Sequence, residues 1–173
     1  LDDAIRMNWS ISQEGLTKQY GLGVGKNIYD SIRAENKADD MQNYIVATAA
    51  AAADVRMSGG TKAVMTICGS GNQGITATLP VIAAVLSLKA DEEMLYRSLA
   101  LSCLITIHVK QFIGKLSPLC GCGMGSSIGV GCALTYLQGG GLSQIRSAIN
   151  NMIADVSGII CDGAKAGCAL KIA

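Results

Sequence analysis

The segment ATAAAAA (residues 47–53) lies inside a longer stretch, Asp39 to Met57, that the sequence predicts to be one helix. Alanine is the strongest helix former, an acidic residue suits the start, and SGG at residues 58–60 provides a stop. So many alanines in one helix indicate that its neighbours pack closely against it. The stretch therefore favours an all-α fold of closely packed helices.

The composition of the whole chain agrees with that fold class. Its 173 residues are 50% hydrophobic, 16% charged and only 4% aromatic. This mixture suits packed helices better than a β-sandwich, whose strands favour aromatic and β-branched residues. Because we find no repeat and no linker, we expect residues 1–173 to form a single all-helical domain. The chain begins at Leu1, directly in a helical pattern, so we also expect it to be a piece of a longer polypeptide.

Charge and cysteine content exclude several classes of partner. The formal net charge is +1 and there is no basic block, which argues against nucleic acid and anionic membrane surfaces. The longest uncharged apolar run, residues 75–88, looks too short to span a bilayer and contains Pro80. Seven unevenly spaced cysteines and no visible signal peptide predict a reducing, cytoplasmic location. Glycine- and alanine-rich helix faces would suit a homodimer.

The N-terminal part contains a motif that resembles a phosphate loop. Residues 2–18 have the apolar pattern of an amphipathic helix, and YGLGVGK (residues 20–26) follows it. Tyr20 stands where a phosphate loop has its first glycine, and Asn27 replaces the Ser or Thr. We therefore interpret this segment as a turn between helices and not as a nucleotide site.

A second glycine-rich motif, GSGNQG (residues 69–74), directly precedes an apolar helix that runs through Pro80 towards Ala90. The first N–H groups of a helix have no internal partner, and the helix dipole there favours a carboxylate. The alternative is an ordinary turn with an Asn or Ser cap. We favour a substrate-binding loop, whose candidate residues are Ser70, Gly71, Asn72 and Gln73.

Asp91 is predicted to cap the next helix, and residues 95–112 are apolar on all sides. This pattern predicts a central, buried helix. His108, the only histidine, lies near its C-terminal end, where a structural histidine is more common than a catalytic one. Lys110 and Lys115 follow; solvated end-of-helix lysines are the default interpretation, although Lys110 could be a buried amine.

The last part of the chain is predicted to contain two further helices. Gly125 and Gly129 are one turn apart and would allow close approach of a neighbour, and Cys132 is expected in the core. Ser143 is expected to cap an amphipathic helix that leads to Cys161. The start of a glycine-rich helix should therefore meet a C-terminal loop.

Four cysteines flank that predicted meeting point: Cys120 and Cys122 in LCGCG (residues 119–123), and Cys161 and Cys168 in ICDGAKAGCA (residues 160–169). Cysteine thiolates are the usual ligands of iron–sulfur clusters, and glycines let the backbone wrap closely around a cofactor. We predict that three of the four hold a [4Fe-4S] cluster. The alternative is that they are small core residues. No CxxC…CxxC pattern suggests a zinc ribbon or a ferredoxin.

Three motifs taken together, GSGNQG (69–74), LSPLCGC (116–122) and GIICDGAKAGC (158–168), resemble the L-cysteine desulfidase family. This family is also described as serine dehydratase alpha-chain-like and is related to the iron–sulfur L-serine dehydratases. The resemblance covers nearly the whole chain, with the motifs in the family's order. It implies that the chain corresponds to the C-terminal portion of a longer polypeptide, whose N-terminal part would be a partner of this one.

The resemblance implies an all-α catalytic domain with an oxygen-sensitive [4Fe-4S] cluster. It also implies α,β-elimination on L-cysteine to pyruvate, ammonia and sulfide, or on L-serine as an L-serine ammonia-lyase. By motif, the cluster ligands match Cys161, Cys168 and one of Cys120 and Cys122, with Cys120 favoured. The seven-residue spacing of the last two ligands resembles the desulfidase branch. Three lysines are candidates for the general base: Lys110, Lys115 and Lys165.

Two other hypotheses belong to different classes. A pyridoxal-phosphate lyase would use Lys165 or Lys110 as its Schiff base, but the chain lacks the α/β alternation that such an enzyme would show. A non-catalytic helical assembly domain would use its cysteines only as core residues. Substituting Cys161 and Cys168 separates these hypotheses, because only the iron–sulfur enzyme needs both thiols for bound metal and activity.

Overall fold

The computed structural model describes residues 1–37, 40–114 and 117–173 and confirms the all-α fold class. Within these ranges the chain forms α-helices, one π-helical segment and two isolated β-bridges, without a strand. The elements in chain order are α1 (Asp2–Thr17), α2 (Val24–Ala34), α3 (Met41–Met57), α4 (Gly71–Leu88), α5 (Glu92–Ile113), the π-helical η1 (Gly121–Ser126), α6 (Ser127–Leu137), α7 (Leu142–Val156) and α8 (Cys168–Ile172).

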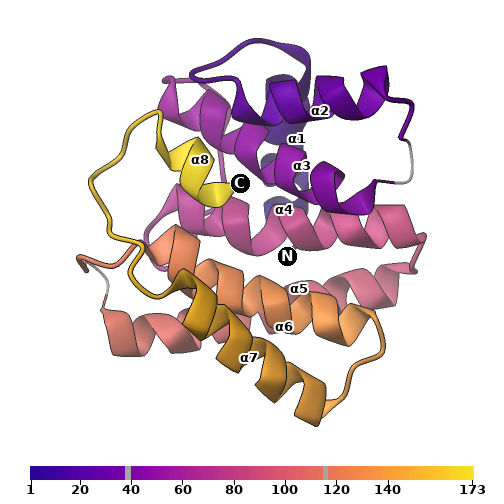
Figure 1. Cartoon of the computed structure of the whole chain (residues 1–173), viewed down its shortest axis with the longest axis vertical. Coiled ribbons are helices and arrows are strands. Elements are labelled where there is room, and N and C mark those ends of the chain that lie inside the picture. The colour runs from indigo at the N-terminus through magenta and orange to yellow at the C-terminus, as the bar shows by residue number, and fades with distance from the viewer. Residues whose placement is uncertain (38–39, 115–116) are drawn as a thin grey trace.

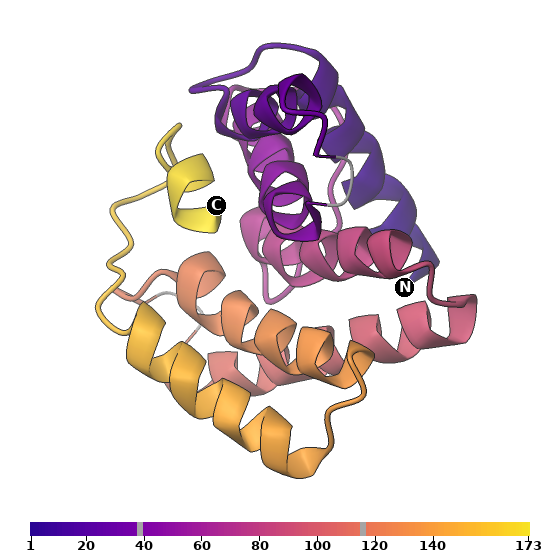
Figure 2. The ribbon, with the colours of Figure 1, turned by 45° about the vertical axis from the view of Figure 1, so that its right-hand side comes forward.

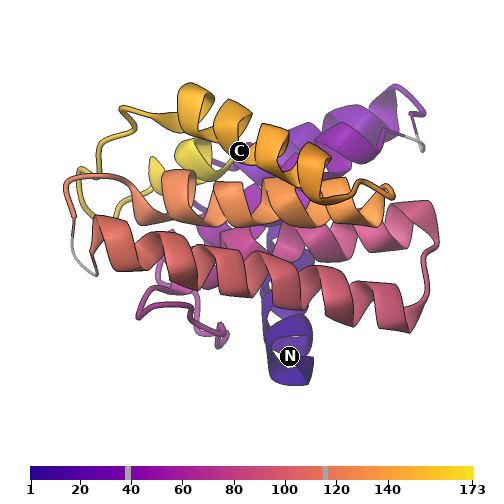
Figure 3. The same cartoon turned by 90° about the horizontal axis from the view of Figure 1, so that it is seen from below.

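Helix α4 runs through the middle of the fold. It contacts α1 and α3 on one side and α5 and α6 on the other (Figure 1). The turned view separates the upper group, α1 to α3, from the lower group, α5 to α7 (Figure 2). From below, α5, α6 and α7 lie in front of the rest (Figure 3). The short α8 packs against α3 and η1.

The alanine-rich α3 is closely packed by its neighbours, as its sequence predicts. Residues 47–55 are all buried. A Cβ on Gly15 would lie 2.3 Å from the Ala51 carbonyl oxygen, and one on Gly25 would lie 2.1 Å from the Ala51 nitrogen. Backbone therefore lies directly on backbone at both contacts. The helix begins at Met41, capped by the Asp40 side chain; Asp39 lies outside the described residues.

The segment that resembles a phosphate loop is a turn between α1 and α2. The Asp54 side chain of α3, only 2% exposed, points into it, and the Gly25 N–H donates to its Oδ2 at 3.0 Å. Burial raises the pKa of Asp54, although N–H groups of residues 22–25 oppose that shift. The anion at this helix start is thus the protein's own carboxylate, which explains the glycine-rich pattern without a nucleotide.

The prediction that residues 95–112 form the central buried helix is wrong. Helix α5 begins at Glu92, capped by Asp91 as predicted, but its outer side is open: Leu104 is 64% and Phe112 77% exposed. Every residue from 71 to 85 in α4 is buried instead. Both helices have apolar residues on all sides, so the sequence pattern does not tell which of them is central. The packing of the neighbouring helices decides it.

Helix α4 is also longer than the apolar run that the sequence suggested. It begins at Gly71 and ends at Leu88, before the expected Ala90, and Pro80 lies inside it. Its length and hydropathy are sufficient to cross a membrane, but 83% of this stretch is buried inside the fold. That environment is the one of a core helix, and it is compatible with a soluble protein.

The later helices follow the prediction with one correction. A Cβ on Gly129 would lie 2.4 Å from the Ser102 carbonyl oxygen of α5, which confirms the close approach, and Cys132 is fully buried. Ser143 does not cap α7. The cap residue is Gly141, whose N–H donates to the Gln144 side chain at 3.1 Å, so α7 begins two residues earlier than expected.

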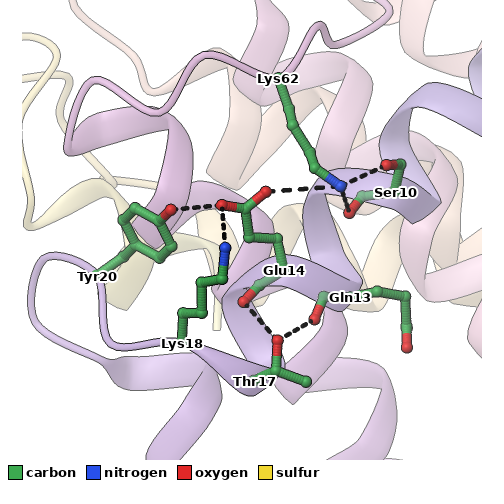
Figure 4. Close-up of polar contacts among 7 residues, drawn as sticks. All are labelled: Ser10, Gln13, Glu14, Thr17, Lys18, Tyr20 and Lys62. Carbon is green, nitrogen blue, oxygen red and sulfur yellow. Dashed lines mark hydrogen bonds and ion pairs between the residues drawn. The ribbon is translucent and has the colours of Figure 1, made fainter.

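A polar network attaches the segment between α3 and α4 to α1 (Figure 4). Glu14 accepts hydrogen bonds from Tyr20 and Lys18, and its carboxylate pairs with Lys62 at 3.5 Å. The Lys62 amine also donates to the Ser10 hydroxyl at 2.7 Å. Residues 61–66 of this segment lie outside any helix.

Candidate functional site

The two cysteine-bearing segments lie side by side, as predicted. Leu119 and Ile160 form an antiparallel bridge. The Cys120 N–H donates to the Ile159 carbonyl at 2.8 Å, and the Cys161 N–H donates to the Pro118 carbonyl at 2.7 Å. In Figure 1 the yellow loop and α8 accordingly lie at the same end of the fold as the start of α6. Backbone pairing thus brings together residues about forty positions apart.

Cys120 and Cys122 form a hydrogen-bonded pair of thiols at the start of η1. Cys120 is 5% exposed, and its sulfur accepts the Gly123 N–H at 3.4 Å. A hydrogen bond from the Cys122 thiol lowers the pKa of Cys120 to about 6. The pKa of Cys122 is raised, because its thiol proton is held in the hydrogen bond to Cys120 and because the thiol is buried. Cys120 is therefore the thiol that ionises first.

Cys168 lies close enough to this pair for its charge to raise the pKa of Cys122 further. Its sulfur is 3.6 Å from the Gly163 carbonyl oxygen, and the residue begins α8. Cys161 is exposed on the adjacent loop. In the part of the chain that the structure describes, no three Cys, His, Asp or Glu side chains are close enough to hold a single metal ion. A [4Fe-4S] cluster is larger than one ion, so the cysteines that hold it are spaced more widely.

The loop between Cys161 and Cys168 is fastened by Asp162. Its carboxylate pairs with Lys165 at 2.5 Å and with Lys171, whose amine also donates to the Ile160 carbonyl at 2.9 Å. These two cations hold the pKa of Asp162 far below its usual range. Lys165, a candidate base, is therefore engaged in an ion pair, and its side chain is 54% exposed.

Lys110 is only 5% exposed, so the default interpretation of a solvated lysine is wrong. A Cβ on Gly121 would lie 3.2 Å from the Lys110 amine and 2.5 Å from the Gln73 amide nitrogen. The amine and the amide therefore both approach the backbone between Cys120 and Cys122. Lys115, the third candidate base, lies outside the described residues.

The predicted substrate loop is only partly a loop. Gly71, Asn72 and Gln73 form the first turn of α4, and Ser70 caps it by accepting the Gln73 N–H at 3.4 Å. The Asn72 side chain turns towards α3, where it accepts a hydrogen bond from Arg56 at 3.0 Å. Gln73 points the other way, towards Gly121, and is 5% exposed. Among the described residues, its Oε1 finds no hydrogen-bond partner.

Sequence reasoning missed two groups at this site. Lys171 lies beside Cys120 and Cys168, whose charges contribute to raising its pKa after the larger effect of Asp162. Its position three residues after Cys168, in a short terminal helix, was a usable signal. Arg56 holds the Asn72 side chain, but the sequence did not point to it. It belongs to no motif, and a cation at the end of a helix such as α3 is common.

Comparisons with known proteins identify the family of the chain. The model of the family described as serine dehydratase alpha chain matches residues 1–173. A UPF0597 protein of Clostridium perfringens is 48% identical over 171 residues, covering 99% of this chain and 40% of the relative. A UPF0597 protein of Oleidesulfovibrio alaskensis is 46% identical over 171 residues, with the same coverage of 99% and 40%.

A UPF0597 protein of Fusobacterium nucleatum is 48% identical over 168 residues, covering 97% of this chain and 39% of the relative. The chain thus spans about 40% of the length of these relatives. No solved structure matches it. With its family model matched from the first residue to the last, the chain belongs to the serine dehydratase alpha chain family.

Proposed function

We propose that the chain is the cluster-binding part of a cytoplasmic iron–sulfur lyase that converts L-cysteine to pyruvate, ammonia and sulfide. Membership of the serine dehydratase alpha chain family supports a lyase of this general kind. The single observation that carries the proposal is the crowding around Gly121. There, the Gln73 amide and the Lys110 amine approach the backbone between two cysteines.

The donor set fits an iron–sulfur cluster. Three of Cys120, Cys122, Cys161 and Cys168 would hold it, and the lowered pKa of Cys120 supplies a thiolate at neutral pH. Bound in this way, the cluster would supply a Lewis acid at an iron that no protein thiolate occupies. We favour the cysteine substrate over serine because the spacing of Cys161 and Cys168 resembles the desulfidase branch.

The chain's own residues would orient the substrate and move its proton. Gln73 Oε1 is a buried acceptor that accepts no hydrogen bond from residues 1–37, 40–114 or 117–173, and the α-ammonium group of an amino acid would satisfy it. The Lys110 amine is the favoured general base for the Cα proton, because it is buried and approaches Gly121 between two of the candidate cysteines. As the Cα–H bond is broken, the Cβ–S bond breaks and sulfide leaves. The resulting aminoacrylate takes up water and releases pyruvate and ammonia.

Anaerobic reconstitution with iron and sulfide tests the proposal. We expect about four irons per chain. Three of the variants Cys120→Ser, Cys122→Ser, Cys161→Ser and Cys168→Ser should lose iron. Cys103→Ser, on α5 and outside the cysteine site, is the matched control and should keep iron. Iron retained by all four variants would leave the cysteines as core residues of a non-catalytic domain.

Activity is measured as pyruvate released from L-cysteine and from L-serine. Because the chain covers 40% of its relatives, the same assay is run on the full-length Clostridium perfringens relative. If the full-length protein is active and this chain only binds iron, the remaining segment of the polypeptide completes the site. Turnover of serine alone would assign the ammonia-lyase reaction instead. Activity that requires pyridoxal phosphate and no iron would contradict the proposal.

A further inference from the structure

A second cleft lies at the opposite end of α4 from the cysteines. It has a volume of about 660 Å³ and lies between α2, the start of α3 and the C-terminal end of α4. Leu86 lines it, whereas Gln73 marks the cysteine end of the same helix. At 1.5 Å per residue, the two positions are roughly 20 Å apart along α4. The cleft is therefore separate from the candidate active site.

Four polar side-chain groups in this cleft make no hydrogen bond or ion pair within the described part of the chain. They are the guanidinium of Arg33, the amide of Asn36 and the hydroxyls of Tyr29 and Tyr44. Among the described residues of the lining, Arg33 is the charged one. Ligand pockets typically combine apolar walls with a few polar groups that orient the ligand, and these four groups are available for that role.

The remaining walls are apolar and aromatic. The rings of Tyr29 and Tyr44 are 6.2 Å apart and tilted by 41°, which is too close to hold a third ring between them, so they form one wall. Ile32, which is buried, and Leu86, which is 53% exposed, also line the cleft. Burial, followed by the effect of Tyr29, raises the pKa of Tyr44, so its hydroxyl stays a proton donor at neutral pH.

We propose that this cleft binds a small aromatic carboxylate. The guanidinium of Arg33 matches a carboxylate in shape and charge, and Asn36 and the phenols provide further donors. The aromatic body of the ligand packs between the tyrosine wall and Leu86. A cleft of this size accommodates such molecules. The proposal does not depend on the lyase activity, because it uses no residue of the cysteine site.

Ligand-observed NMR and calorimetry on the purified chain test this proposal, with phenylacetate as the probe. Phenylacetamide has the same shape without the charge, and phenyl phosphate carries a different anion. Arg33→Gln removes the cation from the exposed side of α2. Arg146→Gln makes the same change on the exposed surface of α7, outside the cleft, and is the matched control.

We expect saturation transfer between phenylacetate and the tyrosine protons, at least tenfold weaker binding to Arg33→Gln, and unchanged binding to Arg146→Gln. Phenylacetamide should bind at least tenfold more weakly than phenylacetate. Equal binding of phenylacetamide, or of phenylacetate to Arg33→Gln, would overturn the proposal. Tighter binding of phenyl phosphate would overturn the carboxylate assignment, and the absence of any phenylacetate signal would overturn the site itself.

Discussion

Helix α3 and the cysteine-bearing loop before α8 belong to the same fold but are held in different ways. Around α3, glycines bring backbone onto backbone, and residues 47–55 are buried without exception. The loop from Cys161 to Cys168 is mostly exposed and is held by a few backbone hydrogen bonds and the ion pairs of Asp162. The first region is held by dense packing, and the second by a small number of polar contacts at the surface.

A glycine-to-alanine substitution should therefore strongly destabilise the protein beside α3 and have almost no effect in the loop before α8. Gly25→Ala places a Cβ 2.1 Å from the Ala51 nitrogen, and neither backbone can move without separating α2 from α3. We expect a loss of about 3 kcal/mol or failure to fold. Gly167→Ala, where nothing lies within 4 Å and φ is −62°, should change stability by less than about 0.5 kcal/mol. Urea unfolding measures both, and equal effects would contradict the comparison.

A smaller effect is expected where α3 holds the α1–α2 turn by a hydrogen bond. Asp54→Ala removes the acceptor of the Gly25 N–H and should cost about 1–3 kcal/mol. Asp54→Asn keeps the shape and one oxygen and should cost less.

The stability of the wild type and that of Asp54→Asn should also depend differently on pH. Burial raises the pKa of Asp54 above the value of about 3.9 that aspartate has in an unfolded chain. In the window between the two values the folded state binds more protons, so the contribution of Asp54 to stability falls as pH rises. Urea unfolding from pH 4 to pH 7 should show wild type losing stability relative to Asp54→Asn; a gain would mean that the N–H groups outweigh burial.

The cysteines also differ in this respect, because some are buried in the packed core and others lie on the exposed loop. Cys132 is fully buried in α6, and Cys132→Ser puts a hydroxyl into the core at a cost of about 1–3 kcal/mol. Cys161 is exposed, so Cys161→Ser should change the free energy of unfolding by less than about 0.5 kcal/mol. Thermal unfolding of the iron-free proteins checks this, and a large loss in Cys161→Ser would make Cys161 a structural residue.

A small effect on stability is also expected at Asp162. Asp162→Asn weakens two exposed ion pairs, and pairs of this kind contribute little to stability. The loop from residue 160 to residue 168 should nevertheless become more mobile, because Asp162 joins it to α8. Amide hydrogen exchange at residues 160–171 should increase while α3 is unchanged; unaltered exchange in the loop would show that backbone pairing alone holds it.

The sequence predicted which residues belong to the candidate site, but not that they lie close together in space. The four cysteines, Gln73 and Lys110 are all visible as unusual residues in the sequence. Their meeting at Gly121 depends on how α4, α5 and η1 pack, which local patterns do not encode. Lys110 illustrates the limit, since a lysine near a helix end looks solvated until the neighbouring helix covers it.

The sequence by itself determined the helices and the close packing around α3. Alanine propensity, the Asp91 cap and the glycine stops act within a few residues, and local interactions of this kind can be identified from the sequence alone. Only the tertiary structure decided that α4 and not α5 is central, and that Asp54 fills the glycine-rich turn. Those outcomes depend on contacts between residues far apart in the chain, where many apolar helix faces compete for the same core.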